Sequence, residues 1–195
     1  MFGLLYGFYE HFTKKTEHHV ITLGLDSVGK TALMERIKAT YSMVQPLPME
    51  KIMPTVGLNI ARVVIGSSKL ILWDLGGQAG LRPIWEKYYD EAQAIIFVID
   101  ASNDSRFEEA KSALEMVLRH PEIKRNIPLL ILVSKADAVP SNVVAAVESR
   151  INDRIILMMH DEGRPTQVYA TSAVNGQGVT AAIDWLKEKL SQMNT

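Results

Sequence analysis

The segment GLDSVGKT at residues 24–31 is the feature that most limits the fold of this chain. It overlaps an apolar run, VITLGL at 20–25, that predicts a buried strand, and it opens KTALMERIKATY at 30–41, which has a helical pattern. Glycines let such a loop curl so that successive N–H groups converge on an anion at the positive end of a helix dipole. The match to G-x-x-x-x-G-K-[ST] in this context predicts a phosphate-binding loop.

The rest of the chain alternates between β-branched apolar runs and helical patterns. Further strands are expected at 59–65, 69–75, 94–100, 128–134 and 167–172, and helices at 106–119, about 141–158 and 179–192. The turn Gly66-Ser67-Ser68 joins 59–65 to 69–75 as a hairpin, which gives one antiparallel edge strand. The expected fold is therefore α/β, with a six-stranded, mostly parallel sheet and helices on both faces. No internal repeat or linker divides the chain.

Composition excludes several classes of function. The chain has no cysteine, which rules out disulfides, cysteine-ligated zinc and thiol catalysis. A formal net charge of −1 without a long basic run argues against binding to nucleic acid. No uninterrupted apolar stretch is long enough to span a membrane, and the N-terminus lacks the features of a secretory signal, so a cytoplasmic protein is expected.

Residues near the phosphate loop have the chemistry of phosphoryl transfer. Lys30 supplies a charge for the β- and γ-phosphates, and the Thr31 hydroxyl is a candidate Mg²⁺ ligand. In WDLGGQ at 73–78, Asp74 can bind Mg²⁺ through water, Gly77 can offer its N–H to a γ-phosphate, and Gln78 can orient an attacking water. Lys30, Gly77 and Gln78 are thus the candidate catalytic residues.

A third segment, PTVG at 54–57, places Thr55 in a loop before the hairpin. Its hydroxyl can close over Mg²⁺, which makes Thr55, together with Thr31 and Asp74, a candidate metal ligand. Taken alone, Thr55 would be an ordinary loop threonine; its neighbours favour the functional interpretation.

The chain resembles small GTPases of the ADP-ribosylation factor (Arf and Arf-like) family over nearly its whole length. The segments that carry the resemblance are GLDSVGKT, PTVGLNI, WDLGGQ and the KYY that follows. Asp26, where Ras-type loops carry glycine, and DLGGQ favour this branch. The resemblance implies a Ras-like P-loop NTPase fold that binds GTP, GDP and Mg²⁺ and hydrolyses GTP slowly. It also implies an exchange factor, an activating protein, and effectors that contact regions 50–60 and 74–89. The implied phosphate-loop contacts are Gly24, Asp26, Ser27, Val28, Gly29, Lys30, Thr31 and Ala32.

The family's guanine-reading motif is N-K-x-D, which here is SKAD at 134–137. Asp137 can accept hydrogen bonds from the N1–H and exocyclic amine of guanine, and the stem of Lys135 can lie along the base. Ser134 is shorter than asparagine, so we expect hydrogen bonds that tie the base and neighbouring loops together to be lost or passed to water, at about 1–3 kcal/mol, with faster exchange of a nucleotide that still binds. Ser172 and Ala173 resemble the last base-contacting loop, in which the Ala173 N–H meets guanine O6.

The N-terminus is predicted to be an amphipathic helix at 1–16, followed by a GTPase domain at 17–195. Large apolar side chains fall on one helical face: Phe2, Leu4, Leu5, Phe8, Tyr9 and Phe12. In the family this helix is released on GTP loading and binds a membrane surface or a membrane receptor. Phe2 stands where most members carry a myristoylated glycine, so no acyl anchor is expected. The resemblance implies reversible recruitment to the cytosolic face of trans-Golgi or endosomal membranes in vesicle trafficking.

Two alternatives remain open at this level. A nucleotide-binding scaffold with little or no hydrolysis is suggested by Ser134, and an adenine-using P-loop kinase is disfavoured by Asp137. Arg82 is expected to be a solvated residue rather than an arginine finger in cis. Trp73, Trp85 and Tyr88 are either an exposed aromatic patch for effectors or simple packing of the hairpin.

Overall fold

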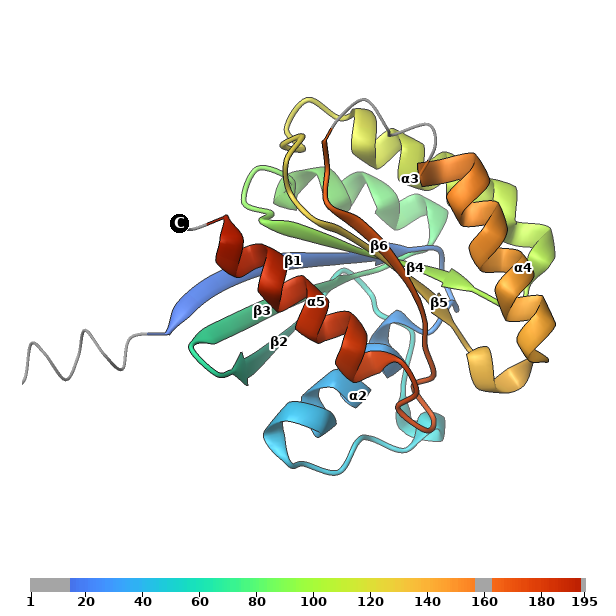
Figure 1. Cartoon of the computed structure of the whole chain (residues 1–195), viewed down its shortest axis with the longest axis horizontal. Helices are drawn as coiled ribbons and strands as arrows, with labels where there is room; N and C mark the ends of the chain where they lie inside the picture. Colours follow the sequence, from blue (N-terminus) through green and yellow to red (C-terminus); the bar gives the residue numbers. More distant parts are fainter. Residues whose placement is uncertain (1–14, 157–162, 194–195) are drawn as a thin grey trace, which may run out of the picture.

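The computed structural model describes residues 15–156 and 163–193 and contains the expected six-stranded sheet, in the order β2-β3-β1-β4-β5-β6 (Figure 1). The strands are β1 (Thr16–Gly24), β2 (Leu58–Ile65), β3 (Ser68–Leu75), β4 (Ala94–Asp100), β5 (Leu129–Ser134) and β6 (Thr166–Ala170). β2 is antiparallel to β3, and all other neighbours are parallel. The predicted fold class is confirmed, including the antiparallel edge strand.

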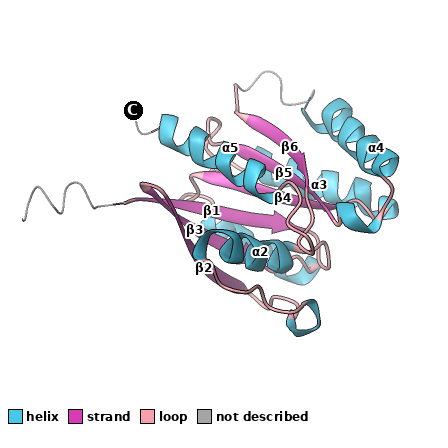
Figure 2. Ribbon diagram, turned by 60° about the horizontal axis from the view of Figure 1, so that its bottom comes forward, coloured by secondary structure: helices cyan, strands magenta, loops and turns pink. Residues whose placement is uncertain are grey.

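Helices cover both faces of the sheet (Figure 2). α2 (Lys30–Ser42) and α5 (Val179–Gln192) contact each other on one face, and α3 (Phe107–Arg119) and α4 (Ser141–Ile151) lie on the other. Short 3₁₀ turns join these elements: η1 (Met49–Lys51), η2 (Ala79–Tyr88), η3 (Asp104–Arg106) and η4 (Ala136–Ala138). No helix within the described residues is long and apolar enough to cross a membrane.

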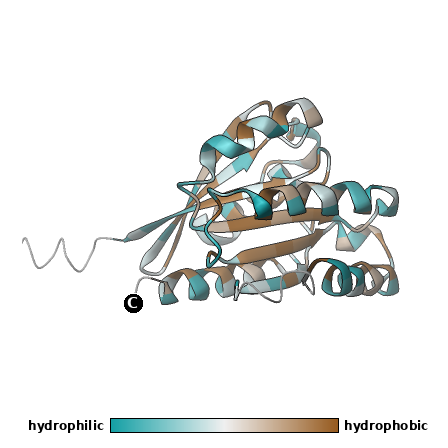
Figure 3. Ribbon diagram, turned by 90° about the horizontal axis from the view of Figure 1, so that it is seen from above, coloured by the Kyte–Doolittle hydropathy of each residue, from teal (hydrophilic) through white to brown (hydrophobic). Residues whose placement is uncertain are grey.

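The sequence pattern of each strand follows from its place in the sheet. β4 and β5 are central and buried along almost their whole length, so they read as continuous apolar runs. β2 is at the edge, and its second half alternates between buried residues such as Val63 and exposed ones such as Val64. Figure 3 shows the resulting apolar sheet between helices that carry both polar and apolar residues.

Element ends differ slightly from the sequence-based expectation. The helix expected at 141–158 ends at Ile151 and continues as a π turn, Asn152–Ile156, while 157–162 fall outside the described residues. β6 ends at Ala170, before the predicted 172, and Ser68 pairs with Ile65, which shortens the hairpin turn. The helix predicted at 1–16 lies outside the described residues except for Lys15 and Thr16, and Thr16 already belongs to β1.

This topology gathers the predicted site loops at one edge. The parallel strands β1, β3, β4, β5 and β6 all present their carboxyl ends there. The strand ends, with the loops that follow them, carry GLDSVGKT, LGGQ, Asp100, SKAD and TSA, respectively. Open α/β sheets bind ligands outside these ends, so the fold brings the predicted residues to the expected position.

Candidate functional site

The loop after β1 is fixed by a glycine and by Lys30. Gly24 has φ +139°, and a Cβ there would lie 2.5 Å from the Val98 carbonyl oxygen. The buried Lys30 donates hydrogen bonds from Nζ to the carbonyl oxygens of Gly24, at 3.0 Å, and Leu25, at 2.6 Å. Burial lowers the pKa of Lys30 to about 8, although nearby Asp74 opposes this shift. The lysine therefore stands folded against its own loop, at the start of α2.

Three oxygen-bearing side chains from separate segments meet beside Lys30. Thr31 Oγ1 lies 2.7 Å from Asp74 Oδ2, Thr55 Oγ1 lies 3.0 Å from the same oxygen, and the two hydroxyls are 2.8 Å apart. Thr31 is in the first turn of α2, Thr55 is in the loop before β2, and Asp74 is near the end of β3. The structure thus brings the three predicted metal ligands together.

The chemistry of this group fits a magnesium ion. Asp74 is fully buried, and among the described residues its Oδ1 has no hydrogen-bond partner. Burial raises the pKa of Asp74, and hydrogen bonds from Thr31 and Thr55 partly oppose this rise. Hydroxyl and carboxylate oxygens are hard ligands of the kind Mg²⁺ prefers, and Mg²⁺ in phosphate sites usually needs only one or two protein carboxylates.

The segment after β3 packs directly onto the phosphate loop. A Cβ on the buried Gly77 would lie 2.3 Å from the Leu25 carbonyl carbon and 2.4 Å from the Gly24 oxygen, so no side chain fits there. Gln78 follows it and is exposed. Both residues line a cavity of about 300 Å³, which is also lined by Lys30, Thr31 and Thr55 and by other residues of 26–32 and 49–54. The predicted catalytic residues therefore share one cavity.

A neighbouring cavity of about 100 Å³ connects the phosphate loop to the segments after β4 and β5. Lys135, in the left-handed region at φ +57°, places Nζ 2.7 Å from Asp100 Oδ2. Burial opposes ionisation of Asp100, but hydrogen bonds from Lys135 and Ser102 hold its pKa below the usual value. Asp137 is exposed in η4, and the Ala136 N–H donates to the Thr171 carbonyl at 3.1 Å, so the SKAD and TSA loops are adjacent.

Ser134 connects β5 to the phosphate loop and to β4 through its hydroxyl group. Its buried Oγ lies 2.6 Å from the Val28 carbonyl oxygen and 3.1 Å from the Ile99 carbonyl oxygen, both of which can accept its proton. The expectation that serine here loses the ties to neighbouring loops is wrong for the phosphate loop, because β5 lies close enough for a short side chain to reach Val28. This contact needed the three-dimensional spacing of the strands and could not be read from SKAD.

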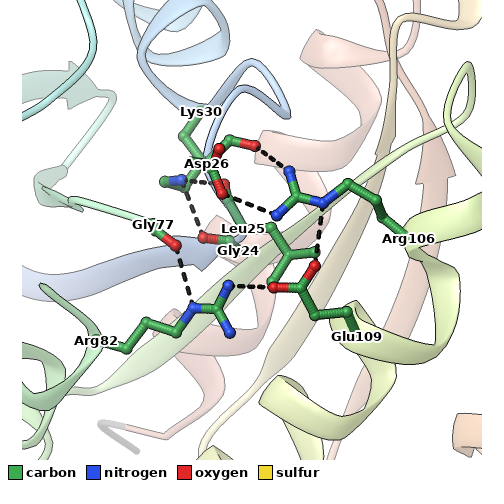
Figure 4. A network of polar contacts seen from close by, with 8 residues as sticks. All are labelled: Gly24, Leu25, Asp26, Lys30, Gly77, Arg82, Arg106 and Glu109. Atoms are coloured by element: carbon green, nitrogen blue, oxygen red, sulfur yellow. Dashed lines mark hydrogen bonds and ion pairs between the residues drawn. The ribbon is translucent and has the colours of Figure 1, made fainter. Parts of the chain in front are cut away.

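Figure 4 shows a charged network that sequence reasoning missed. Arg106 donates from Nη2 to Asp26 Oδ1 at 2.8 Å, from Nη1 to the Asp26 carbonyl at 3.0 Å, and from Nε to Glu109 Oε2 at 3.0 Å. Glu109 Oε1 accepts from Arg82 Nη2 at 2.5 Å, and Arg82 Nε donates to the Gly77 carbonyl at 3.1 Å. The network connects the phosphate loop, α3 and the segment after β3, and hydrogen bonding to Arg106 lowers the pKa of Asp26.

Arg82 is therefore not the solvated residue expected from the sequence. Its side chain is only 16% exposed and is fixed by Glu109 and Gly77. The one signal in the sequence was Asp26 itself, which departs from the glycine of Ras-type loops. Nothing in its spacing pairs it with Arg106, 80 residues away.

The aromatic residues of the hairpin and η2 pack inward. Trp85 is buried, and its Nε1 donates to the Gly76 carbonyl at 2.9 Å. Trp73 is also buried, with its ring 4.7 Å from His19 and 5.2 Å from Tyr88 between centroids. Of the two interpretations left open for these residues, the structure supports packing.

Comparison with known proteins gives consistent matches. The sequence model of the ADP-ribosylation factor family matches residues 5–190. ADP-ribosylation factor-like protein 3 of Saccharomyces cerevisiae is 35% identical over 98% of this chain and 95% of its own length. ADP-ribosylation factor-related protein 1 of Homo sapiens is 35% identical over 95% of this chain and 91% of its own. The structure of the Arl6 BBS3 small GTPase from Trypanosoma brucei, with bound nucleotide analogue GppNp, superimposes with a TM-score of 0.73 at 28% identity, covering 91% of this chain and 99% of that one.

Proposed function

The chain belongs to the ADP-ribosylation factor family, and from this premise we propose that its cavity holds GTP or GDP with Mg²⁺ and works as a slow hydrolytic switch. The family's small GTPases bind and hydrolyse GTP. The observation that carries the assignment to this cavity is the convergence of Thr31, Thr55 and Asp74 within 2.7 to 3.0 Å of one another, beside Lys30.

Each residue of the phosphate side has a role in the proposal. The backbone amides of the loop from Gly24 to Ala32 surround the phosphates, and Lys30 moves from its carbonyl contacts to the β- and γ-phosphates. Thr31, Thr55 and Asp74 hold Mg²⁺, which when bound neutralises charge on the phosphate oxygens. The Gly77 N–H contacts the γ-phosphate, and Gln78 orients the attacking water. Because Arg82 is tied to Glu109 and Gly77, fast hydrolysis needs a stabilising group from an activating protein.

Thr55 links the chemistry to a change in surface. It is the only one of the three proposed ligands on a long loop, so contact with Mg²⁺ and the γ-phosphate would hold region 50–60 against the site. Cleavage of the γ-phosphate removes that support, together with the contact at Gly77, and releases regions 50–60 and 74–89. These regions are the proposed surfaces for effectors, an exchange factor and an activating protein.

The purine side of the site is proposed to select guanine. Asp137 accepts from N1–H and the exocyclic amine, Lys135 lies along the base, and the loop of Ser172 and Ala173 offers an N–H to O6. Exposure of Asp137 in η4 leaves its carboxylate accessible to a ligand.

The proposed cellular setting is the cytosolic face of trans-Golgi or endosomal membranes, in vesicle trafficking. It is supported by the apolar N-terminal face and by the similarity to ADP-ribosylation factor-related protein 1. Localising the chain with and without residues 1–15 tests this part. Unchanged recruitment of the truncated chain would contradict an N-terminal membrane or receptor contact.

The biochemical test begins with nucleotide content. Purified protein is denatured, the supernatant is chromatographed, and single-turnover GTP cleavage is followed with and without a GTPase-activating domain of the family, in the unmodified chain and in Gln78→Leu. We expect bound guanine nucleotide, slow cleavage that the activating domain speeds, and loss of that response in Gln78→Leu. A folded protein that binds guanine nucleotide without cleaving it under any of these conditions would favour the scaffold. A protein that binds none would overturn the assignment.

A further inference from the structure

A side chain of α2 holds the loop that follows β6. Arg36 extends from α2, which runs beside this loop in Figure 1. Its Nε donates to the Ala173 carbonyl at 2.6 Å, and its Nη2 donates to the Val174 carbonyl. The two acceptors lie 137 and 138 residues further along the chain. A charged donor fixed on two neighbouring carbonyls is among the stronger kinds of hydrogen-bonded contact in a protein.

The same two peptide units are also held at their other ends. Ser172 Oγ accepts hydrogen bonds from the Val174 N–H at 3.1 Å and the Asn175 N–H at 3.2 Å. The Ala173 carbonyl and Val174 N–H belong to one planar peptide group, and the Val174 carbonyl and Asn175 N–H belong to the next. Arg36 and Ser172 together therefore fix the rotation of two successive peptide planes.

One donor of this loop is left without a protein partner. Within 15–156 and 163–193, nothing accepts a hydrogen bond from the Ala173 N–H. Ser134 does not supply a tie to this loop, because its hydroxyl is directed at Val28 and Ile99. Within the part of the chain that the structure describes, the side-chain hydrogen bonds from the phosphate-binding helix α2 to this loop come from Arg36.

The Ala173 N–H belongs to the preceding peptide group, whose Ser172 carbonyl accepts from the Gly176 N–H at 3.0 Å. We propose that Arg36 is a positioning residue for purine selection: by holding the peptide group that follows Ala173, it completes the restraint on both sides of this residue and so keeps the free Ala173 N–H directed at O6 of a bound guanine. This inference rests on the proposed binding of guanine nucleotide. Arg36 lines neither of the two cavities described above. It would nevertheless determine how strongly the site recognises the 6-oxo group of guanine and how fast the nucleotide dissociates.

The test compares Arg36→Ala with Lys38→Ala, a control on the same helix. Lys38 pairs with Glu35 at 2.7 Å and, in the described structure, forms no hydrogen bond or ion pair with residues 171–178. Affinities are measured for GDP, for 6-thio-GDP, whose sulfur is a weak acceptor in place of O6, and for IDP, which keeps O6 but lacks the exocyclic amine. Dissociation of GDP is followed by fluorescence of a labelled analogue.

In Arg36→Ala we expect GDP to dissociate on the order of tenfold faster, as loss of a charge-assisted hydrogen bond implies. The preference for GDP over 6-thio-GDP should fall by a factor of about three or more, while the preference for GDP over IDP stays unchanged because Asp137 sets it. Arg36→Lys, which keeps one charged donor, should lie between Arg36→Ala and the unmodified chain. Lys38→Ala should behave as the unmodified chain.

Two results would overturn the inference while leaving the proposed function intact. One is equal behaviour of Arg36→Ala and Lys38→Ala. The other is an equal loss of affinity for all three nucleotides in Arg36→Ala and Arg36→Lys, which would make Arg36 general support for the fold. Failure of the unmodified, folded chain to bind any of the three would instead refute guanine binding itself, and Arg36 would lose its role with it.

Discussion

Replacing Ser134 with alanine tests whether a short side chain ties β5 to the phosphate loop. Ser134 is only 1% exposed, and its hydroxyl contacts the carbonyls of Val28 and Ile99 at 2.6 and 3.1 Å. Alanine leaves these buried oxygens without that donor and adds no bulk, so the free energy of unfolding should fall by about 1–3 kcal/mol. Because Val28 lies in the phosphate loop, the untied loop must also be ordered again when nucleotide binds. GDP release should therefore accelerate as well, by a smaller factor than the stability loss implies.

The assay is urea unfolding of the nucleotide-free chain, followed by release of a fluorescent GDP analogue. Ser105→Ala is the matched control, because the exposed Ser105 also loses one hydroxyl contact, to Asn103 Oδ1 at 2.8 Å. The control should change the free energy of unfolding by less than about 0.5 kcal/mol. If Ser134→Ala matched the control within error, the contact with Val28 would contribute nothing, and serine at this position would be a real loss relative to asparagine.

Three further substitutions test other parts of the site. Glu109→Gln should slow GTP cleavage several-fold relative to Glu115→Gln on the same helix, because Arg82 then holds Gly77 less firmly; equal rates in single-turnover assays would contradict this. Hydrogen bonds from Arg82 and Arg106 lower the pKa of Glu109. The ionised Glu109 side chain therefore stabilises the fold above the usual carboxylate pKa, and this stabilisation should disappear as pH falls through the lowered pKa. At that pH the unfolding curves of Glu109→Gln and the unmodified chain should converge. Gly77→Ala should abolish tight GTP binding, since its Cβ meets the phosphate-loop backbone, whereas Gly80→Ala, with open space around the added atom, should not; equal affinities by calorimetry would refute the steric argument. Asp74→Asn should raise the melting temperature of the nucleotide-free chain, because burial disfavours the charged carboxylate, yet remove the effect of EDTA on nucleotide release; retained sensitivity to EDTA would count against Asp74 as a magnesium ligand.

The fold could be predicted almost completely from the sequence because its signals are local. β4 and β5 are continuous apolar runs between polar loops, and the phosphate-loop motif fixes the order strand, loop, helix. The ends of elements were less certain because they depend on tertiary contacts. β6 ends at Ala170. The next residue, Thr171, donates its N–H to the Val133 carbonyl and accepts from the Ala136 N–H in the loop after β5, and the hydrophobic periodicity of the sequence does not predict this change.

The candidate site divides in the same way. Residues within motifs, such as Lys30 and Asp74, could be named from spacing, and the structure places them close enough to interact. Residues that hold those motifs in place could not. Arg36, Arg82 and Arg106 each occupy a helical position where a solvated charge is the ordinary expectation. Each also bonds to a different segment: Arg36 to Ala173, Arg82 to Glu109 and Arg106 to Asp26. Each of the three also donates to a backbone carbonyl oxygen, which has no sequence signature.

A side chain that donates to a backbone carbonyl oxygen also orients the neighbouring N–H group. In a trans peptide the carbonyl and the following N–H point in opposite directions, so a donor that fixes the carbonyl from outside turns the amide inward. Trp85 binds the Gly76 carbonyl and so sets the Gly77 N–H, and Ser134 binds the Val28 carbonyl and so sets the Gly29 N–H. Arg106 does the same for Ser27 through the Asp26 carbonyl. A nucleotide offers mainly oxygen acceptors, so a site for it needs amides aimed at one volume. Here the side chains that bind the opposite carbonyls provide that aim, which is why the roles of Trp85 and Arg106 escape a search for binding motifs.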